Sequence, residues 1–315
     1  MLVAAAGSPH AVYHMNYLQA VVIGLIQGIF EVFPLSSLGH TVLIPAWIGG
    51  TWGLMVRQES RPESPYLAFV VGLHLANALA LLIFYLREWA RLIIAFFRTI
   101  VRRRIETDSE RLAWLIVIAT IPVGILGILL EHEFRVLFAK PLAAALFLMV
   151  NGLILAAGER IRRRQRPEPE PPDEPAGRRL ITRRTERELA GIGARSALVI
   201  GAAQSLALLA GISREGVAMV GGLYRGLSNE NALRFAFMLS TPVILAAGAL
   251  KVPDLLGPLG RDIRGQAVVG SIVAVLASLA AIALVTRWFK TRTLRPFAMY
   301  SLLFGLASAI RFGLF

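Results

Sequence analysis

A short segment near the N-terminus carries more reactive side chains than its apolar surroundings require. Within QGIFEVFPLSSLGH, residues 27–40, Gln27 and Glu31 are four positions apart, so an amide and a carboxylate share one helix face. Oxygen donors of this kind suit a hard cation such as Mg²⁺ or Ca²⁺. The segment also holds two hydroxyls and an imidazole, which can supply a nucleophile with a base or an acid. These groups belong to Ser36, Ser37 and His40.

A second polar segment, GISREG at Gly211–Gly216, supplies a positive charge that the first segment lacks. Its Arg214 can bind a phosphate oxyanion through two parallel N–H groups. Ser213 precedes this arginine and Glu215 follows it. Helix N-termini at the two interruptions would add backbone N–H donors for an anion. Together the segments predict phosphoryl transfer, because positioning and charge neutralisation supply most of its catalysis.

The composition places both segments in a membrane protein. Hydrophobic residues make up 56% of the chain, more than a typical soluble domain contains. The net charge of +13 comes from arginines grouped between apolar runs, which is typical of cytoplasmic loops and argues against a nucleic-acid-binding protein. The absence of cysteine excludes disulfides, thiol nucleophiles and Cys-ligated metals. In this setting the substrate is expected to be a lipid phosphate.

Two interrupted segments and six long apolar runs organise the chain into an all-α integral membrane protein. The first interrupted segment starts at Tyr17 and is broken by Pro34 and Gly39, while the second runs from Ala190 to Tyr224. Each is too short on either side of its break to cross a bilayer, which predicts two re-entrant helical hairpins. The predicted spans are Tyr66–Leu86, Trp114–Leu130, Leu142–Ala157, Ala232–Leu250, Ala267–Thr286 and Phe297–Ile310.

Basic residues assign a side of the membrane to each connection. Arg87–Glu110, residues 159–188 and Arg287–Arg295 hold most of the arginines and fall on one side, which we assign to the cytoplasm. Both termini are then extracytoplasmic. The segment 159–188 is rich in proline and charge, which predicts a flexible linker. The loops expected on the other side are Gly49–Pro65, Glu131–Pro141 and Lys251–Arg264.

The two interrupted segments also repeat each other. Within a single membrane domain, 1–315, residues 17–158 form a first repeat and residues 189–313 a second, joined by the linker at 159–188. Three spans follow each interrupted segment, and an odd number inverts the second copy. Such inverted repeats build one site near the bilayer midplane. The matched positions are Gly24 with Gly201, Gln27 with Gln204, Ser36 with Ser213, and Gly39 with Gly216.

One span holds two further polar residues, His74 and Asn77. They can form a hydrogen-bonded packing pair or contribute to the site, and the sequence leaves both interpretations open.

The same residues make the chain resemble a known family, the undecaprenyl-diphosphate phosphatases, which are the bacitracin-resistance integral membrane phosphatases. The family's first motif, E/Q-x-x-x-E followed by P-x-S-S-x-G-H, is matched by Gln27–Glu31 and Pro34–His40. Its second motif, P-G-x-S-R-S-G-x-T, is matched in part by AGISREGVA at Ala210–Ala218. Further similarities lie at Ala119–Gly127, Arg234–Pro242 and Pro296–Gly305.

The resemblance implies an enzyme of the bacterial cell membrane that hydrolyses undecaprenyl diphosphate to the monophosphate, recycling the carrier lipid for peptidoglycan and other wall polymers. It also implies an inverted-repeat fold and a divalent cation, Mg²⁺ or Ca²⁺. The implied catalytic residues are Glu31, Ser37, His40 and Arg214, with Ser37 or His40 as the nucleophile. Phosphate would be bound by Gln27, Ser36, Ser213 and Arg214, and the cation by Glu31 and Gln27. The expected partners are the polyprenyl diphosphate lipid and the bilayer, with a homodimer left open.

The chain departs from the family pattern in its second motif and at Gln27, the less acidic of two accepted residues. Ala210, Glu215 and Ala218 replace Pro, Ser and Thr. Glu215 is the largest change, because it adds a negative charge beside Arg214. One hypothesis is that Glu215 supplies the carboxylate missing at position 27 and shares the cation. The rival hypothesis is a paralogue with an altered substrate or reduced activity.

Two other functions fit the same features. An inverted repeat with a midplane site is also a transporter architecture, so a transporter or flippase of polyprenyl phosphates is the main alternative. A low-activity homologue that only binds the lipid is the second.

Overall fold

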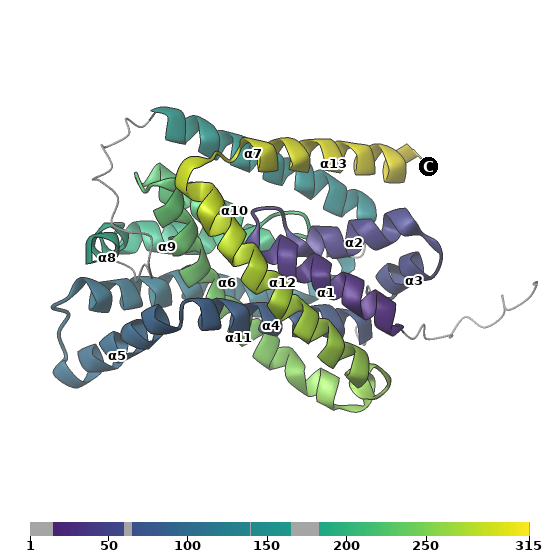
Figure 1. Ribbon diagram of the computed structural model, residues 1–315, viewed down its shortest axis with the longest axis horizontal. Helices are drawn as coiled ribbons and strands as arrows, with labels where there is room; N and C mark the ends of the chain where they lie inside the picture. The colour runs from purple at the N-terminus through teal and green to yellow at the C-terminus, as the bar shows by residue number, and fades with distance from the viewer. Residues whose placement is uncertain (1–14, 60–64, 139, 165–182, 315) are drawn as a thin grey trace, which may run out of the picture.

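The computed structural model describes residues 15–59, 65–138, 140–164 and 183–314, and this part of the chain is helical without strands (Figure 1). Six of its helices are long and apolar enough to cross a bilayer. The prediction of an all-helical protein with six spans is therefore confirmed. These helices are α4 (Pro65–Phe84), α6 (Asp108–Phe138), α7 (Pro141–Arg164), α11 (Asn229–Leu256), α12 (Arg264–Thr291) and α13 (Arg295–Leu314).

The interrupted segments fold into two short helical hairpins. In the first, α1 (Tyr17–Val32) turns into α2 (Ser37–Ile48). In the second, α9 (Ala194–Ala203) passes through a 3₁₀ turn, η1 (Gln204–Leu208), before α10 (Arg214–Tyr224). The first break follows from local chemistry, because Phe33 precedes a proline and adopts an extended conformation that ends α1. All four helices are shorter than a bilayer crossing requires.

The helices pair in the way that a two-fold related repeat would produce. Helix α4 packs against α11, and α7 packs against α13. These helices occupy equivalent positions in the two repeats predicted from the sequence. Helix α1 packs against α12, and its counterpart α9 packs against α6, the counterpart of α12. If the two repeats exchange places, the α4–α11 and α7–α13 contacts are unchanged, and the α1–α12 contact becomes the α9–α6 contact.

A matched glycine in each repeat sets these contacts. Gly24 of α1 lies against α12 so closely that a Cβ would stand 2.6 Å from the carbonyl oxygen of Gly270. Its matched residue, Gly201 of α9, lies even closer to the backbone carbonyl of Ala119 in α6. Small residues allow helix backbones to approach where a bilayer provides no hydrophobic drive between helices. The same sequence device thus docks both hairpins.

Several connections expected to be loops are helical. The segment Arg87–Glu110 contains a helix, α5 (Leu86–Arg102), because its apolar residues recur on one helical face. The linker 159–188 is helical at both ends, in α7 and in α8 (Arg183–Ala190), and its residues 165–182 lie outside the described part. Charged residues extend helices through pairs such as Glu159 with Arg162 and Arg163. The other additions are α3 (Gly50–Glu59), the end of α6, and η2 (Pro258–Ile263).

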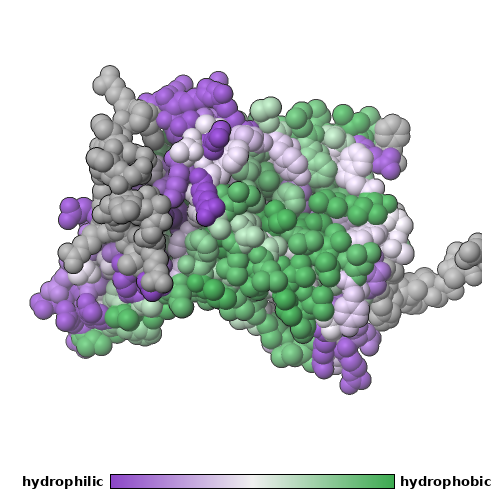
Figure 2. Space-filling model, viewed as in Figure 1, coloured by the Kyte–Doolittle hydropathy of each residue, from purple (hydrophilic) through white to green (hydrophobic). Residues whose placement is uncertain are grey.

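The surface has the distribution expected in a bilayer. Figure 2 shows hydrophobic side chains across the middle of one face and hydrophilic ones toward its left and right ends. Large apolar side chains such as Ile128, Leu129 and Leu276 are mostly exposed on the spans. The protein is therefore a multi-pass membrane protein.

Candidate active site

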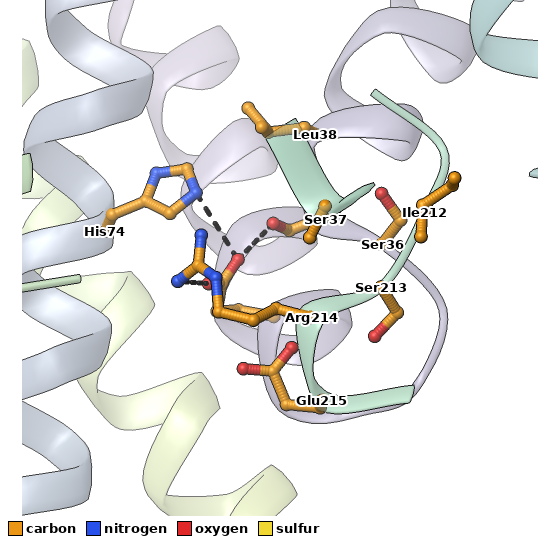
Figure 3. A pocket seen from close by; sticks show the side chains of 10 residues that line it. Ser36, Ser37, Leu38, His74, Ile212, Ser213, Arg214 and Glu215 are labelled. Atoms are coloured by element: carbon orange, nitrogen blue, oxygen red, sulfur yellow. Dashed lines mark hydrogen bonds and ion pairs between the residues drawn. The ribbon is translucent and has the colours of Figure 1, made fainter. Parts of the chain in front are cut away.

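The tips of the two hairpins enclose a small polar pocket (Figure 3). The first tip contributes residues 36–38 and the second contributes residues 212–215. Both stretches are helix N-termini, of α2 and of α10, so the positive ends of two helix dipoles face the same space. The remaining lining residues are Glu31, His74 and Ala207.

Close backbone contact holds the tips together. A Cβ on Gly39 would lie 2.8 Å from the Cα of Gly211, which itself has a φ of +116° that favours glycine. The Ser36 hydroxyl oxygen accepts from the Gly211 amide at 3.0 Å and from the Gly39 amide at 3.3 Å. Ser213 caps α10 in the same way, accepting from the Gly216 amide at 3.1 Å. The serines matched in the repeat are thus equivalent helix caps.

Asn151 of α7 ties both tips to the spans. Its Nδ2 donates to the Pro34 carbonyl at 3.0 Å, and its Oδ1 accepts from the Ser213 amide at 3.0 Å. Nδ2 also donates to Ser301 of α13 at 3.3 Å. One fully buried side chain therefore fixes the position of each tip relative to the other.

Glu31 is the centre of the pocket's polar contacts. Its Oε2 accepts hydrogen bonds from Ser37 Oγ and, at 3.2 Å, from Gln27 Nε2. His74 Nε2 lies 3.4 Å from the same oxygen, and Arg214 Nη1 lies 3.8 Å from Oε1 (dashed lines in Figure 3). A buried carboxylate needs such partners, since an unpaired charge at this depth is strongly unfavourable. Four residues from three chain segments thus converge on one group.

His74 and Asn77 do not pair with each other. His74 Nδ1 donates to the Val70 carbonyl at 2.9 Å, which turns Nε2 toward Glu31. Asn77 Nδ2 instead donates to the Gln27 carbonyl at 3.2 Å, and its Oδ1 accepts from Ser278 of α12 at 2.8 Å. His74 is therefore a pocket residue, while Asn77 anchors α1.

His40 lies outside the pocket, behind the first tip. Its ring stacks on Phe30 with centroids 3.8 Å apart. Its Nδ1 donates to the Ser36 carbonyl at 2.7 Å, so Nε2 accepts from the Tyr300 hydroxyl at 2.9 Å. With both ring nitrogens engaged and the side chain fully buried, His40 supports the tip's backbone and does not reach the pocket.

Buried polar atoms around the pocket remain without hydrogen-bond partners among the described residues. They are Gln27 Oε1, Arg214 Nε and Nη1, and Glu215 Oε1. Native interiors rarely leave such atoms unsatisfied, so a group of them in one place indicates a ligand site. The arginine supplies donors for an anion, and the amide and carboxylate oxygens supply acceptors for a cation.

Comparison of the sequence with known proteins identifies relatives of this chain. A sequence model of the family described as "Bacitracin resistance protein BacA" matches residues 20–307. The chain belongs to this family. It is 51% identical to "Undecaprenyl-diphosphatase 2" of Frankia alni, with 96% of this chain and 99% of the relative covered. It is also 51% identical to "Undecaprenyl-diphosphatase" of Mycolicibacterium paratuberculosis, with 94% and 97% covered. The resemblance inferred from the motifs is confirmed.

Within this BacA family member, the structure adds site residues to those that the motifs suggested. The motif residues Glu31, Ser37 and Arg214 do meet in one pocket. His74 joins them, and Asn151 positions the tips, although neither belongs to a motif considered above. Their signal in the sequence is a lone polar residue in an apolar span, which marks a place where function or assembly needs it.

Proposed function

We propose that the protein hydrolyses the terminal phosphate of undecaprenyl diphosphate, releasing undecaprenyl phosphate and inorganic phosphate. The relatives' names supply the substrate class. The observation that carries the chemistry is the hydrogen bond from Ser37 Oγ to Glu31, opposite Arg214 of the other hairpin. A hydroxyl, a base and a phosphate-binding cation in one buried pocket are the parts that such a reaction needs.

Ser37 is the proposed nucleophile. Its Oγ attacks the terminal phosphorus while its proton passes to Glu31, and the anhydride P–O bond breaks to release undecaprenyl phosphate. Glu31 gives this proton to the departing bridging oxygen and is a carboxylate again. Water then attacks the phosphoserine and passes its proton to Glu31, and the bond between phosphorus and Ser37 Oγ breaks to release inorganic phosphate as Glu31 returns the proton to Oγ. His40 is the weaker candidate because both of its ring nitrogens are hydrogen-bonded away from the pocket. Arg214 stabilises the charge on the equatorial phosphate oxygens.

The helix N-termini provide further phosphate contacts. The Ser36 and Ser213 oxygens accept backbone hydrogen bonds, so each hydroxyl proton is left to donate to a phosphate oxygen. The dipoles of α2 and α10 favour negative charge between the tips. This arrangement stabilises negative charge on the transferring group.

The oxygen donors also fit a divalent cation. Gln27 Oε1 and Glu215 Oε1 are buried without hydrogen-bond partners among the described residues. Glu31 lies one turn after Gln27 on α1 and lines the same pocket as Glu215. Among the described residues no three acidic or histidine side chains form a complete metal cluster. Mg²⁺ is commonly held by one or two carboxylates together with substrate phosphates, which matches this incomplete set. When bound, the cation would neutralise charge on the diphosphate.

The role of Glu215 is tested by Glu215→Ser, alone and combined with Gln27→Glu. If Glu215 shares the cation, the single change should weaken the binding of Mn²⁺, which can be measured from the electron paramagnetic resonance spectrum of the ion. It should also raise the cation concentration needed for phosphate release. Gln27→Glu should restore both. A Glu215→Ser variant that is as active as the wild type and no less dependent on metal contradicts this assignment.

The reaction is tested by phosphate release from undecaprenyl diphosphate with the purified chain. Ser37→Ala should lower the rate by at least about 10³-fold, as loss of a nucleophile does in comparable enzymes. The matched control is Ser308→Ala, which removes a buried serine outside the pocket whose Oγ accepts a hydrogen bond from Trp47 Nε1. Brief reaction with labelled substrate should leave a labelled phosphate on Ser37. Phosphate release by Ser37→Ala at the wild-type rate would refute the assignment of Ser37 as the nucleophile.

The orientation is a further part of the proposal. In this proposal the arginine-rich connections, including α5 and the ends of the segment 159–188, lie on the cytoplasmic side of the bacterial cell membrane, and both termini lie on the other side.

The paired hairpins also suit a transporter of polyprenyl phosphates. Movement of labelled lipid between leaflets of proteoliposomes, without phosphate release, would favour that alternative.

A further inference from the structure

Helix α5 has three distinct faces. Glu88, Leu92, Ala95 and Thr99 recur at intervals of three or four residues and are buried against the protein. The adjoining face is apolar and exposed. The third carries arginines at positions 87, 91, 98 and 102, whose spacing by four and seven residues keeps them in one row.

The apolar face is exposed to a degree that a water-soluble surface would not tolerate. Ile94 is 57% exposed, Phe97 is 59% exposed and Val101 is 83% exposed. Neighbouring apolar residues extend this face along the whole helix as one stripe, which in water would be a strongly unfavourable patch. The remaining members are Leu86, Ile93 and Ile100.

The basic row lies on the flank of α5 between the buried face and the apolar stripe. Residues 86–107 contain six arginines and two glutamates. Arg91 pairs with Glu186 of α8 at 2.8 Å, and Arg102 with Glu106 at 3.5 Å, while Arg87 and Arg98 are exposed. The helix ends at Arg102, and two further arginines follow it: Arg103, which is left-handed, and Arg104, whose Nε lies 3.0 Å from Glu106 Oε1. In Figures 1 and 2, this end of α5 lies among hydrophilic residues at the left edge, beside a hydrophobic lower edge.

The charge decides what covers the apolar stripe. A spanning helix would carry the arginine row into the hydrocarbon, where each charged side chain near the centre is strongly unfavourable. A helix lying in the membrane plane avoids this cost, because its apolar stripe enters the acyl region and its arginines remain at headgroup level. Anionic headgroups complement the charge of the row and add about 1 kcal/mol per arginine.

We infer that α5 lies in the membrane interface, with its apolar stripe in the acyl chains, and binds anionic phospholipid headgroups through Arg87, Arg98 and the arginines at its C-terminal end. The kink at Tyr85, where φ is −105° and ψ is 30°, separates α5 from the spanning helix α4. This surface is distinct from the pocket between the hairpins, and it does not depend on the reaction proposed above.

The position of the helix can be measured directly because the chain has no cysteine. Single cysteines at Ile94, Phe97, Val101, Arg87 or Arg98 are spin-labelled in the full chain, reconstituted in vesicles of phosphatidylcholine and phosphatidylglycerol. The three stripe positions should be accessible to oxygen and shielded from a water-soluble nickel reagent, and the two arginine positions should show the opposite. Equal water exposure at all five, or a depth that increases steadily along the helix, would overturn the inference.

The headgroup preference is tested with the same vesicles and charge variants. Arg87→Gln with Arg98→Gln should reduce the phosphatidylglycerol retained by the purified protein, counted by native mass spectrometry, by about fivefold per arginine. The matched control is Arg261→Gln, an exposed arginine in η2, outside this row. Unchanged retention in the double variant, or an equal loss in the control, would refute anionic lipid binding by α5.

Discussion

The link between the hairpin tips gives a quantitative prediction. Asn151→Leu keeps the side chain's size but removes its hydrogen bonds to the Pro34 carbonyl and the Ser213 amide, each 3.0 Å long. Each buried group left without a partner costs about 1–3 kcal/mol, so the free energy of unfolding should fall by about 2–6 kcal/mol. Displacement of one tip by about 1 Å should lower phosphate release by roughly 100-fold.

The measurement is paired unfolding and phosphate-release assays on the full chain in the same detergent. The control is Asn77→Leu, which also removes fully buried hydrogen bonds, but these join α4 to α1 and α12 and do not reach the hairpin tips. Its unfolding free energy should fall to a similar extent, while its rate should fall much less than that of Asn151→Leu. Rates lowered equally in the two variants would show that Asn151 has no special part in aligning the tips. Wild-type behaviour of Asn151→Leu in both assays would refute the reasoning entirely.

Three other predictions follow from single contacts. His40→Phe keeps the ring stack but loses both hydrogen bonds of the histidine. The free energy of unfolding should therefore fall by about 1–3 kcal/mol while phosphate release persists. Complete loss of phosphate release by a folded variant would make His40 a nucleophile candidate again. Gly39→Ala puts a methyl group 2.8 Å from the Cα of Gly211, so the free energy of unfolding should fall by about 1–3 kcal/mol and phosphate release should become slower. A variant that behaves like the wild type in both assays would contradict the close contact between the tips. His74→Leu removes a polar partner of Glu31 and should lower kcat/KM by about tenfold, whereas an unchanged kcat/KM would limit His74 to packing.

The hairpins and spans were predictable from sequence because their signals are local. Apolar runs of sufficient length gave the six spans, and Pro34 beside a polar cluster gave the first break. The constant offset between matched residues predicted equivalent tips, and Ser36 and Ser213 are equivalent caps. Membrane burial makes such signals strong, since unsatisfied backbone is excluded from hydrocarbon.

The contacts between distant segments were not predictable in this way. A motif places His40 near Ser37 in the chain, yet the histidine ring stacks on Phe30 and bonds Tyr300, so it does not line the pocket. His74 reaches Glu31 only because α4 packs beside α1, which no local pattern specifies. The sequence predicted a loop where α5 lies because the many arginines of this segment are typical of a polar connection. The helical spacing of its apolar residues is the signal that would have predicted a helix.

The repeat explains why the site is built from unequal halves. Equivalent serine caps give both tips the same backbone, so two helix N-termini meet. Identical chemistry at the next position would set either two hydroxyls or two arginines against each other. Instead, the offset that matches the caps places Ser37 opposite Arg214 in the repeat, and it leaves Glu31 without an acidic counterpart. The ion pair between Glu31 and Arg214 joins the halves because each lacks what the other supplies. We propose that the predicted repeat provides the frame, and that differences at single positions within it provide the proposed base, nucleophile and anion-binding cation.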